Sequence, residues 1–402
     1  MAATTSINPA PAIARARRAA VADRYAAGAL ALEWRSLLEL SAIESEWREL
    51  AARALEPNVF YEPAFALPAA RVFGRDAGAV LVWSGTSPRK LLGFFPGRIA
   101  PRRYGLKLPV LLGWTHPYAP LGTPLVERDA AEPVIAAWLA HLADGTALPG
   151  LVLLPYLPTN GPFAAALDAI ARRAQIPTAD FNRHERALLM PRDDRLSYVE
   201  RTLGQRRHKE LRRYVRRLAD CGAILFTTAT EPEPVIKALA DFFALEHRGW
   251  KGQAGTAAVQ HDGVRNFIAT AVGGLAADGK AALNRIFIDG RAIAVTITLR
   301  SGDTAWFWKI VYDETFAQYS PGVVLTFAVT EDLVEDVSIE RTDSCASANH
   351  PMIDHIWRER LPLSDRLVGA RPHAPFASVR RLEMLRNATI GAAKSIRGQF
   401  HL

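Results

Sequence analysis

Apolar residues recur along the chain at two spacings that alternate with one another. Residues 40–55 carry Ile43, Trp47, Leu50 and Ala54 at the spacing of a helix with one buried face. Short apolar runs bounded by turn residues, such as 151–156, are typical of buried strands. Because helical and strand-like segments keep alternating to about residue 370, the pattern predicts an α/β fold.

The predicted elements form two successive groups separated by the polar stretch 191–194. In the first group we predict helices at 40–55, 64–73, 130–142 and 163–174, and strands at 79–83, 91–99, 151–156 and 186–190. In the second group we predict helices at 196–219, 234–247, 263–275, 321–333 and 352–359, and strands at 223–228, 281–288, 291–299, 304–312, 338–342 and 361–367. The similar order of elements in the two groups suggests a duplicated fold.

Composition narrows the class of protein. The 402 residues are 49% hydrophobic and 22% charged, which is ordinary for a folded soluble protein. No apolar run reaches the roughly 20 residues that a membrane helix needs, and the N-terminus lacks the apolar core of a secretory signal. Two widely separated cysteines favour a reducing compartment. We therefore expect a cytoplasmic protein, with peripheral contact at the inner membrane left open.

The net charge of +8 is concentrated in three patches: residues 1–30, 195–221 and 371–402. We expect the first to be a disordered basic arm over 1–29. The last has Val379, Leu382 and Leu385 at helical spacing among arginines, which predicts a basic amphipathic helix. Such a helix could lie on an anionic membrane, bind a nucleotide or another phosphorylated ligand, or dock on the body of the protein.

The stretch 305–324 carries the clearest chemical signal. An apolar strand runs into Ser320-Pro321-Gly322, and an apolar helix follows. Proline suits the first helical turn, and the exposed N–H groups of a helix start attract phosphate. We predict a pyrophosphate seat there. Lys309 interrupts the apolar strand, so it either forms a salt bridge with Asp313 or Glu314 or contacts a substrate.

Four blocks carry a resemblance to a known family: residues 204–213 (GQRRHKELRR), 249–257 with Gly249-Trp250-Lys251-Gly252, 308–314 (WKIVYDE) and 319–325 (YSPGVVL). Residues 195–370 resemble the acetyltransferase-like domain of the CelD/BcsL group (BioF2-like), in the GNAT superfamily and close to the FemABX transferases. The resemblance implies two GNAT-like mixed-sheet units in tandem plus a basic C-terminal helix. It divides the chain into a degenerate unit at 30–192, an acetyltransferase domain at 193–370 and a tail at 371–402.

The resemblance also implies acyl transfer from acetyl-CoA or another acyl-CoA to an amine or hydroxyl. In GNAT enzymes a glycine-containing loop after the fourth strand binds the pyrophosphate, which places Gln318, Ser320, Gly322, Val323 and Val324 at the cofactor. Members of the group are tied to bacterial exopolysaccharide production, so the implied acceptor is a saccharide or a lipid-linked sugar. FemABX relatives use aminoacyl-tRNA instead, and a non-catalytic adaptor at a polysaccharide synthase is a third possibility.

Direct transfer needs a base and a proton donor for the leaving thiolate. Asp343 is the candidate base and Tyr319 the candidate donor, with Lys309 as the third catalytic residue. Each also has a purely structural interpretation, since Asp343 could cap a loop and Tyr319 could pack beside a turn. The substrate-binding candidates share a place in or beside the four blocks: Arg207, Glu246, Trp250, Lys251, Trp308 and His350.

Several other chemistries have no motif in the sequence. There is no P-loop, no G-x-S-x-G and no G-x-G-x-x-G, and no cysteine pair has zinc spacing. His350 and His355 are five residues apart and would not share a helix face. We therefore expect neither a metal nor specific nucleic-acid recognition.

Overall fold

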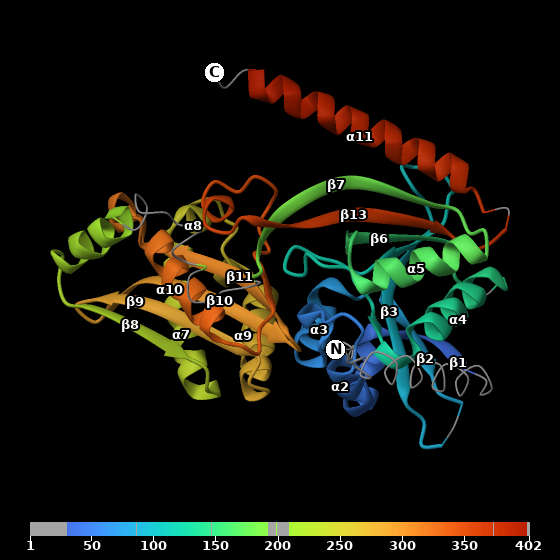
Figure 1. Cartoon of the computed structure of the whole chain (residues 1–402), viewed down its shortest axis with the longest axis horizontal. Coiled ribbons are helices and arrows are strands. Elements are labelled where there is room, and N and C mark those ends of the chain that lie inside the picture. Colours follow the sequence, from blue (N-terminus) through green and yellow to red (C-terminus); the bar gives the residue numbers. More distant parts are fainter. Residues whose placement is uncertain are drawn as a thin grey trace, which may run out of the picture. The chain divides into compact units, whose positions relative to one another are not determined.

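The computed structural model describes residues 30–85, 87–145, 147–191, 198, 209–372 and 374–399, with side chains described up to residue 389 (Figure 1). The predicted basic arm at 1–29 and Arg207 lie outside the described residues. Contacts divide the chain into two compact units, one of residues 1–56, 76–182 and 364–402 and the other of 57–75 and 183–363. The units are thus not the contiguous segments that the sequence suggested.

Unit 1 is built on a mixed sheet with the strand order β1-β2-β3-β4-β6-β13 and with β5 paired to β3. Its strands are β1 (Ala31–Ser36), β2 (Ala77–Trp83), β3 (Leu91–Ala100), β4 (Val110–Gly113), β5 (Leu125–Val126) and β6 (Leu151–Pro158). Its helices are η1 (Leu37–Ile43), α2 (Glu44–Ala52), η3 (Arg128–Ala130), α4 (Ala131–Ala143), α5 (Pro162–Arg173) and α11 (Phe376–Gln399). Strands β7 (Thr178–Leu189) and β13 (Glu359–Gly369) each contribute one part to either unit.

Unit 2 has the strand order β7-β12-β11-β10-β9-β8. Its other strands are β8 (Ile224–Ala229), β9 (Ala281–Ile288), β10 (Arg291–Ser301), β11 (Thr304–Tyr312) and β12 (Arg341–Asp343). Its helices are η2 (Val59–Tyr61), α3 (Pro63–Phe73), α7 (Pro232–Arg248), α8 (Trp250–Gln253), η4 (Ala258–Gln260), α9 (Asp262–Ala277), η5 (Glu314–Tyr319), α10 (Pro321–Glu335) and η6 (Ile353–His355). Residues 209–219 form one further helical stretch.

Helices cover both faces of the sheet in unit 2. On β9, Arg285 donates to Asp241 of α7, whereas its neighbour Asn284 donates to Asp332 of α10. Successive residues of a strand point to opposite faces, so α7 and α10 lie on opposite sides of the sheet. The face under α10 is filled by a buried cluster that includes Phe307. The prediction of an α/β fold with mixed sheets is confirmed.

A segment from early in the chain completes the core of unit 2. Phe65 on α3 is fully buried, and its ring meets Phe267 of α9 edge-on at 5.2 Å and Trp308 of β11 at 5.6 Å. Edge-to-face aromatic pairs of this kind stabilise packing beyond the buried area alone. Glu62, just before α3, accepts hydrogen bonds from Lys280 at 2.8 Å and Ser301 at 2.6 Å. These contacts explain why residues 57–75 belong with unit 2.

Several predicted elements needed correction. The predicted helix at 352–359 is only the single turn η6, because Glu359 already begins β13. The Gly-rich loop after α7 contains the short helix α8, and β1 was not predicted at all. The tail forms α11, which begins at Phe376 and belongs to unit 1. No helix in the described part of the chain is long and apolar enough to cross a membrane.

Candidate active site

A β-bulge in β11 gives the site its shape. Lys309 pairs with Ile297 of β10, and Phe307 pairs with the next residue, Thr298, so that Trp308 is the extra residue. A bulge breaks the alternation of side chains and often lies next to an active site. Phe307 and Ile310 consequently pack into the same cluster under α10, although strict alternation would place them on opposite faces.

Beyond Trp306, β11 separates from β12. The two strands are parallel and pair at three positions only, the last being Trp306 with Asp343. After Asp343 the chain turns away, with Cys345 in the left-handed region at φ 53° and its N–H bonded to Asp343. The strand β11 thus continues to Tyr312 beyond its last pair with β12. Backbone groups of a strand can pair with an extended ligand where no other strand occupies its edge.

The start of α10 offers backbone donors. Ser320 has the left-handed φ of 49° and makes no side-chain cap, while Pro321 has no N–H. The N–H of Val324 is bonded to the carbonyl of Ser320 at 3.1 Å. Within the described chain this leaves the amides of Gly322 and Val323 to bind an anion at the positive end of the helix.

A close contact favours glycine at position 322. A Cβ placed on Gly322 would lie 3.1 Å from Cδ1 of Tyr312, which is tighter than most side chains allow. Tyr312 is 41% exposed and lines the cavity that opens beside the helix start. The glycine therefore lets the aromatic ring and the two amides share one wall of this cavity.

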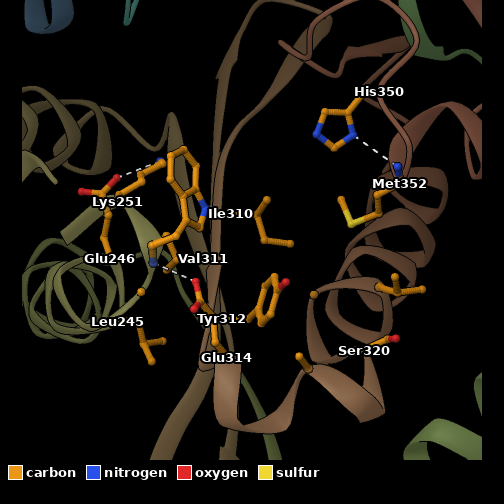
Figure 2. A pocket seen from close by; sticks show the side chains of 15 residues that line it. Leu245, Glu246, Lys251, Ile310, Val311, Tyr312, Glu314, Ser320, His350 and Met352 are labelled. Carbon is orange, nitrogen blue, oxygen red and sulfur yellow. Dashed lines mark hydrogen bonds and ion pairs between the residues drawn. The ribbon is translucent and has the colours of Figure 1, made fainter. Parts of the chain in front are cut away.

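The cavity beside α10 has a volume of about 470 Å³ and draws its walls from several segments of unit 2. Figure 2 shows Glu246 and Lys251 on one side, Ser320, His350 and Met352 on the other, and Ile310 and Tyr312 of β11 between them. Gly249, Trp250, Glu314, Ala317, Gly322 and Val323 complete the lining together with Leu245 and Val311. The site thus brings together residues from three of the four sequence blocks.

Lys309 lies in a smaller adjoining cavity of about 170 Å³, which shares Lys251, Ile310, His350 and Met352 with the larger one. Its amine lies 5.2 Å from the centre of the Trp308 ring. Burial, together with repulsion from Lys251, lowers the pKa of Lys309 from 10.5 to about 8, while the nearby carboxylate of Glu246 acts in the opposite direction. A lysine with such a pKa is partly neutral near physiological pH and can accept a proton.

Three predicted substrate-binding residues, Glu246 near the end of α7 and Trp250 and Lys251 on α8, form one wall of the cavity. Glu246 is 5% exposed and accepts hydrogen bonds from the Lys251 amine at 2.9 Å and the Ala258 amide at 2.8 Å. Glu314 accepts from the Trp250 amide at 2.8 Å, which fixes α8 beside η5. With both oxygens of Glu246 bonded, the residue is better suited to orient Lys251 than to act as a base.

His350 has a defined orientation at the junction of the two cavities. Its Nδ1 accepts a hydrogen bond from the Met352 amide at 3.3 Å (Figure 2). In the neutral ring the proton then lies on Nε2, which makes that atom a hydrogen-bond donor. His350 lines both the larger and the smaller cavity, so this donor is available to a ligand bound near Lys309.

Other predicted site residues do not line either cavity. Asp343 is 2% exposed, forms an ion pair with the buried Arg186 and accepts from the Cys345 amide at 2.9 Å. Gln318 is exposed, and Val324 is buried in the core under α10. Tyr319 lies near the Cys221 thiol, whose hydrogen bond and negative potential raise the pKa of the phenol. The catalytic roles of Asp343 and Tyr319 stay predictions, and these positions favour structural ones.

Some lining residues were not predicted. Tyr312 and Glu314 both belong to the quoted block 308–314, so their position beside the helix start was the available signal. Met352 lies two residues after His350. The single turn η6, which follows it, brings its side chain to the cavity. Among the described residues, no group of three or more His, Cys, Asp and Glu side chains could hold a metal ion.

Comparison with known proteins gives a match for part of unit 2. Residues 205–350 match the family model described as the acetyltransferase (GNAT) domain, so unit 2 holds a GNAT-type domain. The family model does not distinguish the CelD/BcsL group from other GNAT domains, so membership of that group stays a prediction. Comparison with curated proteins gave no match.

Two solved structures share the fold over most of their length. FemX has a TM-score of 0.54 at 8% identity, with 84% of this chain and 98% of that chain covered. The C-terminal domain of a protein described as a lysylphosphatidylglycerol synthetase from Agrobacterium fabrum has a TM-score of 0.51 at 11% identity, with 87% and 96% covered. At such identities the likeness concerns the fold alone.

Proposed function

We propose that unit 2 transfers an acyl group from acyl-CoA to an amine or hydroxyl of a sugar. The observation that carries the proposal is one continuous site in which the amides of Gly322 and Val323 and the amine of Lys309 line adjoining cavities. A cofactor with phosphates at one end and a thioester at the other fits such a site. The part of β11 beyond its last pair with β12 lies between them and suits the amide groups of a pantetheine arm.

The residues of the chain have distinct roles in this transfer. The amides of Gly322 and Val323 bind the pyrophosphate. The neutral amine of Lys309 accepts the proton of the acceptor as its nitrogen or oxygen forms a bond to the acyl carbon. The bond from that carbon to sulfur breaks, and CoA leaves as the thiolate. The Nε2–H of His350 is suited to stabilise the negative charge that develops on the carbonyl oxygen.

The proposed acceptor is a sugar of exopolysaccharide or cell-envelope biosynthesis. Trp250 is 63% exposed at the rim of the larger cavity, and its backbone N–H donates a hydrogen bond to Glu314 that holds it there. A flat exposed indole beside the cation of Lys251 offers both an apolar face and a hydrogen-bond donor, which suits a sugar ring. Amino sugars, whose amine is the stronger nucleophile, are the first acceptors to test.

Calorimetry with acetyl-CoA and a transfer assay with a panel of amino sugars test the proposal. We expect saturable binding of acetyl-CoA and release of free thiol that depends on an acceptor. A Gly273→Ala variant serves as control, because a Cβ at this helical glycine would meet nothing within 4 Å. Absence of binding up to about 1 mM, the upper end of ordinary substrate affinities, would overturn the choice of donor.

A second candidate donor is aminoacyl-tRNA. Residues 209–219 are helical, and the cations Lys209, Arg212, Arg213, Arg216 and Arg217 on this helix are exposed. The same helix borders a further cavity of about 360 Å³, lined by Leu211, Tyr214, Ser320 and Val323 among others. A row of cations beside the site favours the phosphate backbone of RNA. Steeply salt-dependent tRNA binding without affinity for CoA would support this donor.

A further inference from the structure

The outer side of α11 in unit 1 has a composition that the fold itself does not require. Val379 is fully buried and Glu383 is 1% exposed, so the inner side of the helix is packed. Met384 and Leu385, in contrast, are 54% and 64% exposed. A helix that is apolar on its packed side and again on its solvent side has a second surface available for contact.

Helical geometry places this second surface opposite the packed one. At 100° per residue from Val379, Met384 lies at about 140° and Leu385 at about 240°. Arg380 and Arg381 lie at about 100° and 200°, on either side of Met384. The two arginines are exposed, and no ion pair to them is found among the described residues. The solvent side of the helix thus combines protruding apolar side chains with flanking cations.

A loop of the same unit packs against the inner side of the helix. Arg103 and Tyr104 donate hydrogen bonds to Glu383, each at 2.7 Å, which joins residues 101–107 to α11. Tyr104 is 42% and Leu106 is 51% exposed. These bonds also neutralise the only carboxylate in the two segments, and residues 98–107 and 376–389 together hold seven Lys or Arg and that single Glu.

We propose that this face, formed by Arg380, Arg381, Met384 and Leu385, binds an anionic lipid surface. Arginines attract negatively charged headgroups, and the methionine and leucine side chains enter the boundary between headgroups and acyl chains. The buried position of Glu383 removes the one charge that would oppose this. A nucleic acid would use the cations but would leave the exposed Met384 and Leu385 in water.

The test is co-sedimentation of the full chain with vesicles of phosphatidylcholine, with and without phosphatidylglycerol. We expect sedimentation with the anionic vesicles only and a loss of it at high salt. Arg380→Glu combined with Arg381→Glu should lower the partition coefficient at least about tenfold. Met384→Ser combined with Leu385→Ser should lower it by about tenfold even at low salt, because apolar contact is lost.

Matched controls lie in unit 2. Arg265→Glu on α9 and Ile236→Ser on α7 change an exposed cation and a 58% exposed apolar residue away from this face. We expect both to bind vesicles as the unchanged chain does. Equal partition into uncharged vesicles, no vesicle binding, or a dimer that the Met384/Leu385 variant dissociates would each overturn the proposal. Competition by soluble glycerol phosphate would point to a headgroup site in place of a membrane surface.

Discussion

The amine of Lys309 lies 5.2 Å from the centre of the Trp308 ring, and Trp308 is the residue that the β-bulge inserts into β11. The bulge therefore decides where this lysine lies. On a regular strand the side chain of Lys309 would point to the sheet face opposite that of its two neighbours along the strand. Here it lies in the smaller cavity, where burial lowers its pKa to about 8.

If the neutral Lys309 amine is the base, its loss must slow the transfer step. Lys309→Arg keeps the positive charge but cannot release a proton at these pH values, so we expect kcat to fall by about 100-fold or more. In the unchanged chain kcat should rise with pH and level off above about 8. Full activity of the arginine variant would show that Lys309 acts through its charge, and full biological output of Lys309→Ala would favour a non-catalytic adaptor.

The neighbours of Lys309 should move its pKa in opposite directions. Lys251 repels the protonated amine, so Lys251→Met should raise the pKa of Lys309 and shift the rate profile to higher pH. Glu246 attracts the protonated amine, so Glu246→Gln should shift the profile to lower pH. Rate profiles of the two variants, measured at saturating substrate, provide the check. Shifts of equal sign would contradict the assignment of the titrating group.

The role of the α10 start in binding acetyl-CoA can be tested with a substitution that changes no titratable group. A side chain at Gly322 would press on Tyr312 at 3.1 Å and narrow the approach to the two free amides. We expect Gly322→Val to weaken acetyl-CoA binding by about tenfold, which corresponds to the loss of about one good hydrogen bond. Calorimetry gives the affinity, and Gly273→Ala on α9 should bind as the unchanged chain does. Unaltered affinity in Gly322→Val would mean that the donor lies elsewhere.

Variants of Asp343 can distinguish a structural role of this residue from a catalytic one. Its carboxylate pairs with Arg186 in a buried site, and removal of one partner leaves the other charge unpaired. We expect Asp343→Ala to lower the free energy of unfolding by about 3–5 kcal/mol. Denaturant titration measures this loss.

Asp343→Asn provides the complementary measurement, since it keeps the hydrogen bond from the Cys345 amide. We expect it to retain kcat at a temperature where it is folded. A hundredfold lower kcat in a folded Asp343→Asn protein would instead identify the base predicted from the sequence.

Much of the architecture could be predicted because it depends on local patterns. The helix start at Pro321, the strand before it and the basic helix of the tail each follow from spacing or turn residues. The helix predicted at 352–359 was wrong. Its apolar residues, Ile353, Ile356 and Trp357, pack in the core under α10, and the chain then extends as β13. The pattern showed their burial but not their conformation.

The sequence by itself determined the α/β class, the glycine at the helix start and the charges of the tail, since these arise from residues close together in the chain. Only the tertiary structure decided that α3 completes unit 2, that Asp343 pairs with Arg186, and that Lys309 is buried beside Lys251. The physical reason is that packing, ion pairing and desolvation depend on residues far apart in sequence, which no local pattern specifies.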